Sequence, residues 1–196
     1  MIAYNTLWVL ALFGIVLIHE FGHALACKSV GGIANTIVLW PLGGVAYVQP
    51  PERPGAMLWS IAAGPLVNVV LLPLTIAPYL FMTHLGMESA GVEFLGDIAL
   101  MNVALLVFNL LPFYPLDGGQ ILRSLLWFAV GRGTSLVVAA IVGIVGAAAL
   151  GLAGVFFGSI WIMLMAMFMG LQGLNGVRVG QAMQRMDRLQ QPGFPV

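Results

Sequence analysis

Residues 15–27 read IVLIHEFGHALAC, a run that is apolar apart from two histidines and one glutamate. The apolar stretch around it, from about residue 4 to residue 27, is long enough to cross a bilayer as a helix, which takes about 20 residues at 1.5 Å each. An ionisable side chain inside such a helix costs at least about 2.5 kcal/mol. Three ionisable residues within five positions therefore need a common explanation.

The composition of the whole chain indicates a membrane protein. Of the 196 residues, 61% are hydrophobic and 7% are charged, whereas a soluble domain carries about 25% charged residues. The excess apolar surface must face a lipid bilayer, so we expect an all-α polytopic membrane protein. The formal net charge is zero and no basic run is present, which makes nucleic acid a poor candidate partner.

About five transmembrane helices are expected from the long apolar segments. A three-helix core would comprise residues 4–27, 57–81 and 94–111, and two C-terminal helices would comprise residues 134–150 and 155–171, separated at Gly151–Gly154. Residues 118–131 predict a short interfacial helix or the start of the fourth crossing. The chain would thus divide into a core (1–119), C-terminal membrane helices (120–175) and a polar cytoplasmic tail (176–196), with disorder over 190–196.

The basic residues predict the orientation in the membrane. Cytoplasmic loops are enriched in lysine and arginine, and the loop at residues 82–93 contains neither. With the N-terminus outside and five crossings, all seven basic residues fall on one side. We therefore expect an integral protein of a prokaryotic cell membrane, with its active site toward the cytoplasmic side.

The segment from His19 to His23 has the pattern H-E-x-x-H. Positions i and i+4 share one face of a helix, so the two imidazoles can converge on one metal ion. Glu20 lies about 100° around the helix from His19, where it can take a proton from a water molecule at the open coordination position and pass it to a leaving amine. These residue types predict a zinc site with His19 and His23 as ligands and Glu20 as catalytic base.

A catalytic zinc ion also needs a third protein ligand. The acidic candidates outside the motif are Glu52, Glu88, Glu93, Asp97, Asp117 and Asp187. Asp117 is favoured because it follows the third apolar segment on the same expected side of the membrane as His23. Two prolines and two glycines surround it, and irregular backbone at membrane depth is tolerated where it lines a cavity. The alternative is an ordinary loop aspartate.

At this point the sequence resembles the site-2 proteases, a family of intramembrane zinc metalloproteases. The resemblance rests on the H-E-x-x-H motif, on the block from Asn109 to Gly119 with the pattern N-x-x-P-x-x-x-L-D-G-G, and on Gly64-Pro65-x-x-Asn68. It implies one zinc ion per chain, with His19, His23 and Asp117 as ligands and Glu20 as base. It further implies hydrolysis of a peptide bond in or near the transmembrane segment of a single-span membrane protein.

The resemblance also implies that Asn68 and Asn109 lie near the site as contacts to the substrate or the oxyanion. The alternative for both is interhelical hydrogen bonding. The outer loop is too short for a PDZ domain and the C-terminal tail is too short for a CBS domain, so we expect a minimal form. A separate regulatory membrane protein remains a candidate partner.

Residues 37–48 are β-branched and aromatic, with a proline and two glycines in the middle. This composition predicts a short re-entrant β-hairpin after the first helix. Its free edge, at Trp40, Gly43 and Gly44, could hold an unwound substrate segment by main-chain pairing. The alternative is a hairpin that only plugs the site.

Two other functions remain open at this stage. The same side chains could form the transport site of a membrane metal transporter or metal-handling protein. A non-catalytic relative could bind substrate helices without cutting them. The intact ligands and base favour the protease.

Overall fold

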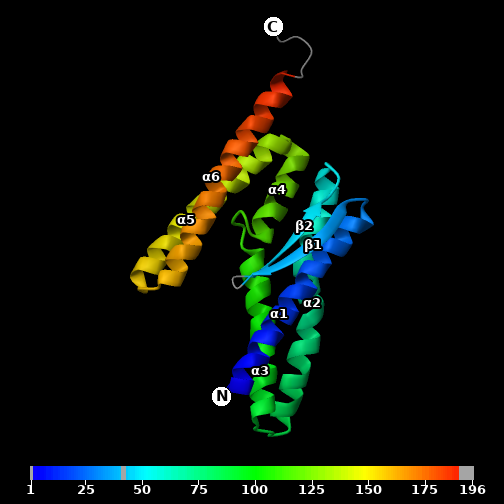
Figure 1. Ribbon diagram of the computed structural model, residues 1–196, viewed down its shortest axis with the longest axis vertical. Helices are drawn as coiled ribbons and strands as arrows, with labels where there is room; N and C mark the ends of the chain where they lie inside the picture. Colours follow the sequence, from blue (N-terminus) through cyan, green and yellow to red (C-terminus); the bar gives the residue numbers. More distant parts are fainter. Residues whose placement is uncertain (1, 41–42, 190–196) are drawn as a thin grey trace. The chain divides into compact units, whose positions relative to one another are not determined.

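The computed structural model describes residues 2–40 and 43–189 (Figure 1). The chain forms two compact units, Met1–Asn109 and Leu110–Val196. The residues 190–196 expected to be disordered lie outside the described part. The two units are described in turn.

The N-terminal unit holds three long helices and one hairpin. These elements are α1 (Ile2–Ser29), β1 (Ile33–Trp40), β2 (Gly43–Gln49), α2 (Pro54–His84) and α3 (Ala90–Leu110). The antiparallel hairpin lies along α1 (Figure 1), and both strands contact that helix. The predicted hairpin is confirmed, and it extends beyond the expected residues 37–48 at both ends.

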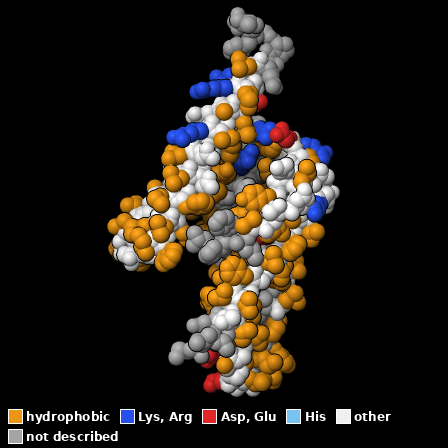
Figure 2. Space-filling model, viewed as in Figure 1, with side chains coloured by type: hydrophobic (Ala, Val, Ile, Leu, Met, Phe, Trp, Pro, Cys, Tyr) orange, Lys and Arg blue, Asp and Glu red, His pale blue; other side chains and the backbone are white. Residues whose placement is uncertain are grey.

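The C-terminal unit holds α4 (Asp117–Val130), α5 (Arg132–Phe156) and α6 (Ile160–Leu189). Helix α4 has 14 residues and is too short to cross a bilayer, which favours the short-helix interpretation of residues 118–131. Helices α5 and α6 form an extensive antiparallel pair. In this unit, Figure 2 shows hydrophobic side chains over the α5–α6 turn and basic side chains toward the C-terminal end of α6.

Five helices in the described part of the chain are long and apolar enough to cross a membrane. They are α1 from Thr6, α2, α3, α5 and α6. This confirms the predicted all-α polytopic membrane fold with about five spans. The polar stretch expected to form a tail from residue 176 continues α6 as one helix to Leu189.

The sequence predicted a break between the last two helices at Gly151–Gly154, and this prediction is wrong. Helix α5 continues through these glycines, and the chain turns after Phe156, where Gly158 has a φ of 63°. A β-carbon at Gly154 would be 3.0 Å from the Met163 backbone nitrogen. Gly154 therefore lets two helices approach closely, which is a common use of glycine in membrane helices.

Small residues also bring α1 and α2 together. A β-carbon at Gly22 would be 2.8 Å from the carbonyl oxygen of Ala63 and 2.7 Å from the Val67 side chain. The buried side of α1 includes Val16, Ala24 and Cys27, while its other side is exposed. Because the two backbones are so close, side chains of moderate length on α1 can reach groups on α2.

Beneath the hairpin, Cys27 is fully buried with Ala24 and Ala34. Its thiol lies 3.5 Å from the carbonyl oxygen of Ile33. This placement agrees with a packing role for the cysteine, and it holds the start of β1 against the end of α1.

Candidate metal site

Helix α1 presents three ionisable side chains on its buried side. His19, Glu20 and His23 are 3%, 7% and 5% exposed. Burial of a charged or polar group is costly unless a partner compensates it. The partners of these three side chains therefore define the chemistry of the site.

Each histidine directs one ring nitrogen to an oxygen of α2. His23 Nδ1 lies 2.9 Å from the carbonyl oxygen of Ser60, and His19 Nδ1 lies 2.5 Å from Asn68 Oδ1. Carbonyl oxygens only accept hydrogen bonds, so each Nδ1 carries the proton and donates. This network assigns the tautomer and makes Nε2 the unprotonated nitrogen of both rings.

The two Nε2 atoms face each other at 3.1 Å, and the rings meet edge to face at 83°. With both protons on Nδ1, the two Nε2 atoms are unprotonated nitrogens that can act as ligands of one cation. Two zinc–nitrogen bonds of about 2.0–2.1 Å can span such a separation. A histidine ligand whose other nitrogen donates to a carbonyl is the usual arrangement at protein metal sites.

Gly64 leaves space for the imidazoles. A β-carbon at this position would overlap His23 Nε2 and would be 2.8 Å from His19 Nε2. Any larger residue on this turn of α2 would thus fill the space beside the two Nε2 atoms.

Asn68 is fixed by a second asparagine from α3. Its Nδ2 donates to Asn102 Oδ1 at 2.7 Å, and Asn102 Nδ2 donates to the Asn68 carbonyl oxygen at 3.1 Å. Both side chains are fully buried. This is the interhelical hydrogen bonding considered as the alternative for Asn68, and it turns Asn68 Oδ1 toward His19.

Asn102 and the Ser60 carbonyl were missed by the sequence analysis. The signal for Asn102 was present, because an asparagine in the middle of an apolar segment is costly without a partner. A backbone carbonyl leaves no such signal. Asn109, which the sequence did single out, lies in the last turn of α3 and, unlike Asn68 and Asn102, is partly exposed.

The carboxylate of Glu20 accepts a hydrogen bond from the hairpin. The backbone nitrogen of Ala46 in β2 lies 2.7 Å from Glu20 Oε2. A β-carbon at Gly44 would be 2.7 Å from Glu20 Cγ and 3.0 Å from Glu20 Oε1. Strand β2 therefore packs directly on this side chain, and the absence of a side chain at residue 44 makes the contact feasible.

Asp117 is the first residue of α4, and the two glycines after it are packed against the preceding loop. A β-carbon at Gly118 would overlap the carbonyl oxygens of Leu110 and Leu111, and one at Gly119 would overlap the backbone of Phe113 and Tyr114. The Gln120 side chain donates to the Pro115 carbonyl oxygen at 3.1 Å. The D-G-G sequence thus permits a tight loop that ends in the aspartate.

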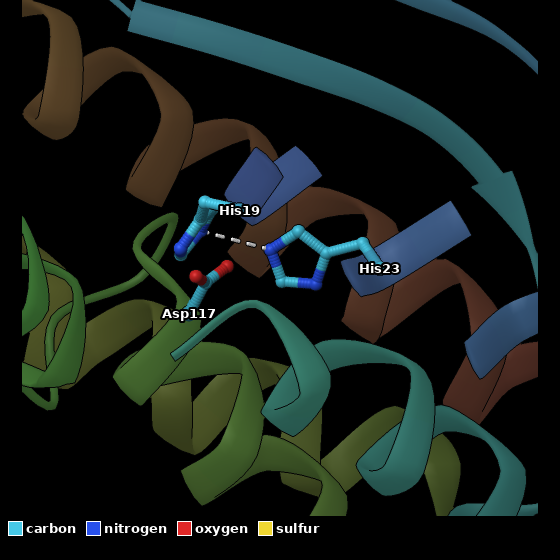
Figure 3. A group of neighbouring side chains, drawn as sticks. All are labelled: His19, His23 and Asp117. Carbon is cyan, nitrogen blue, oxygen red and sulfur yellow. Dashed lines mark hydrogen bonds between the residues drawn. The ribbon is translucent and has the colours of Figure 1, made fainter. Parts of the chain in front are cut away.

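Of the described residues, His19, His23 and Asp117 form a group with metal-binding potential. One candidate ligand atom from each lies within 4.8 Å of the others (Figure 3). The other acidic candidates Glu52, Glu88, Glu93 and Asp187 are exposed, and Asp97 is partly buried. The donor set of two imidazole nitrogens and one carboxylate suits a catalytic zinc ion.

The comparisons with known proteins agree with this chemistry. The family model described as Peptidase family M50 matches residues 7–92 and 79–153. A Synechocystis protein named as a candidate zinc metalloprotease is 30% identical over 93% of this chain, and a zinc metalloprotease of Methanocaldococcus jannaschii is 34% identical over 67% of it. The chain spans 52% and 38% of the length of these two relatives.

A solved structure has the same fold. The site-2 protease from Methanocaldococcus jannaschii is 29% identical to this chain, with a TM-score of 0.68. The match covers 86% of this chain and 76% of the other.

Proposed function

This chain belongs to peptidase family M50, and from that membership we propose that it is a zinc metalloprotease of the membrane. Its substrate would be a single-span membrane protein, cut in or near the transmembrane segment. The observation that carries the proposal is the pair of Nε2 atoms at 3.1 Å, each belonging to a ring whose Nδ1 donates elsewhere.

In this proposal His19, His23 and Asp117 hold one zinc ion per chain. Zinc, when bound, activates a water molecule and polarises the scissile carbonyl. Asn68 and the Ser60 carbonyl orient the two imidazoles by accepting their Nδ1 protons. Asn102 in turn fixes the amide of Asn68.

Glu20 acts as the base. Its carboxylate takes the proton of the attacking water and then gives it to the nitrogen of the departing amine. The N–H of Ala46 stabilises the carboxylate and holds it in one orientation. The resemblance to site-2 proteases further suggests Asn109, in the last turn of α3, as a donor to the substrate or the oxyanion.

The outer edge of β2 suits an extended substrate. The N–H of Ala46 donates to Glu20, so it points away from β1, with which Ala46 is paired through Ile37. Gly44 lies two residues away, and its main-chain groups point to the same edge because strands alternate with a period of two. A substrate strand added there would run beside Gly44 and lie next to the proposed base. Trp40, also expected at this edge, lies in β1 and is paired with Gly43.

The expected orientation forms part of the proposal. All seven basic residues lie in segments assigned to one side by the five-span topology. By the positive-inside rule that side is the cytoplasm, and H-E-x-x-H lies near it. The bilayer would be a prokaryotic cell membrane, in line with the relatives from prokaryotes.

Metal content and turnover test the proposal together. We expect about one zinc ion per chain in the wild type and in Glu20→Gln, and loss of zinc in His23→Ala and Asp117→Ala. Glu20→Gln should lower the cleavage of an unfolded protein in detergent by about 10²- to 10⁴-fold. Zinc retained without Asp117 would refute the ligand set, and full turnover in Glu20→Gln would refute the role of the base.

A further inference from the structure

Helices α5 and α6 lie outside the expected three-helix core, and the proposed metal site takes no ligand from them. Three glycines are nevertheless buried on these helices: Gly143 and Gly146 on α5, and Gly176 on α6. Glycine is less favourable than alanine inside a helix. Buried glycines in the middle of two long helices therefore need a reason in the packing around them.

The loop that joins α3 to α4 fills the space that these glycines leave. A β-carbon at Gly146 would overlap the ring of Phe113. One at Gly143 would overlap the carbonyl oxygen of Tyr114 and would be 3.0 Å from its backbone nitrogen. One at Gly176 would be 3.1 Å from Cε1 of the Tyr114 ring. The three glycines thus form a notch, the glycine notch, in which the loop is seated.

The same two loop residues pack against the first turn of α4. A β-carbon at Gly119 would overlap backbone atoms of Phe113 and Tyr114. The Leu116 backbone nitrogen donates to the Phe113 carbonyl oxygen at 2.8 Å, which closes a turn directly before Asp117. Because close-packed interiors transmit displacements, a shift of Phe113 or Tyr114 in the glycine notch also shifts the backbone of Asp117.

We infer that the glycine notch positions the third ligand of the proposed metal site. The inference rests on the proposed function and extends that site to α5 and α6, which act on Asp117 through Phe113 and Tyr114. A zinc–oxygen bond has a length of about 2.0–2.2 Å, so a small displacement of the carboxylate is enough to weaken it. The two helices are then required for metal binding as well as for anchoring in the bilayer.

The zinc affinity of the full-length protein in detergent, measured by competition with a chromophoric chelator, tests the inference. In Gly146→Ala the added methyl group displaces the Phe113 ring. The affinity should fall about 10- to 100-fold, as it does when a residue that orients a metal ligand is lost.

Gly154→Ala is the matched control in the same helix. A β-carbon there would be 2.8 Å from Met163 Cγ, and the nearest atoms all belong to α6. This variant overpacks the α5–α6 pair away from the loop, so it should lower Tm and keep the zinc affinity of the wild type. A merely structural role of Gly146 would instead make the two variants alike.

A compensating substitution tests the contact itself. Leucine is smaller than phenylalanine, so Phe113→Leu combined with Gly146→Ala should recover most of the lost zinc affinity. If Gly146→Ala does not fold, Phe113→Ala tests the same link, because it empties part of the glycine notch without adding an atom. It should also weaken zinc binding.

Hydrogen exchange of the zinc-free protein provides a readout that does not depend on the metal. Amides in residues 110–120 should exchange faster in Gly146→Ala than in the wild type, because the loop has lost its seat. In Gly154→Ala these amides should exchange as in the wild type.

Two results would overturn the inference. One is a Gly146→Ala variant with the zinc affinity of the wild type, and the other is an equal loss of affinity in Gly154→Ala. A wild type that binds no zinc would instead refute the proposed function. The failure of the inference and the failure of the proposed function are thus told apart by the wild-type zinc content.

Discussion

Gly64 of α2 lies so close to His23 of α1 that a β-carbon would overlap the Nε2 atom of the imidazole. The glycine thus reserves the space beside both histidine Nε2 atoms. This contact explains why the motif that begins at Gly64 on α2 belongs to the same site as His19 and His23 on α1. It also leads to a direct test.

Gly64→Ala should abolish zinc binding, because the added methyl group occupies the space between the imidazoles. Zinc per chain, measured by inductively coupled plasma mass spectrometry, should fall from about one to near zero. Gly14→Ala is the matched control, since a β-carbon there has nothing within 4 Å. Full zinc content in Gly64→Ala would contradict the assignment of this space to the metal.

Asn102→Leu should weaken zinc binding although Asn102 touches no ligand atom. Without its partner the amide of Asn68 is free to rotate, and it no longer holds His19 in the metal-binding tautomer. Loss of such an outer partner typically costs about 10- to 100-fold in affinity. Competition with a chromophoric chelator measures this, and an unchanged affinity would show that Asn68 is held in another way.

Gly44→Ala should slow cleavage and leave zinc content unchanged. The new methyl group would be 2.7 Å from Glu20 Cγ and 2.8 Å from Val16 Cγ1, so β2 must move away from Glu20, the proposed base. Val45→Ala is the control in the same strand, since Val45 is 48% exposed. Equal rates for the two variants would argue against a role for this edge of β2 in catalysis.

Gly118→Ala and Gly119→Ala should destabilise the loop that leads to Asp117. Each methyl group would overlap the backbone of residues 110–114, and overpacking of this kind costs about 1–3 kcal/mol. We expect a lower Tm and weaker zinc binding. Gly151→Ala, where the nearest contact is an ordinary 3.6 Å to Ala166, should leave both values close to those of the wild type.

Much of this arrangement could be predicted from sequence because its signals are local. An H-E-x-x-H motif inside an apolar segment fixes which side chains share one helix face, and segment length and polarity indicate the five spans. The hairpin followed from β-branched residues around a proline and two glycines. Each of these inferences needs only residues that are close in the sequence.

Other features depend on contacts that a single sequence does not reveal. Gly151 and Gly154 resemble a helix break, but in the structure the helix continues through them and Gly154 packs against Met163. The pairing of Asn68 with Asn102 joins two helices, and the Ser60 carbonyl is a main-chain group that any residue could supply. Glycine and asparagine have several roles in membrane helices, and tertiary contacts decide among them.

The hydrogen bond from Ala46 to Glu20 comes from the main chain. Replacement of the Ala46 side chain would therefore leave this donor in place, and a conventional alanine scan of the hairpin would not detect it. A change that removes the amide hydrogen, such as proline at position 46 or an ester in place of the peptide bond, would break the link directly. The side chain at position 46 is therefore not what holds the Glu20 carboxylate, whereas the path of the β2 backbone is.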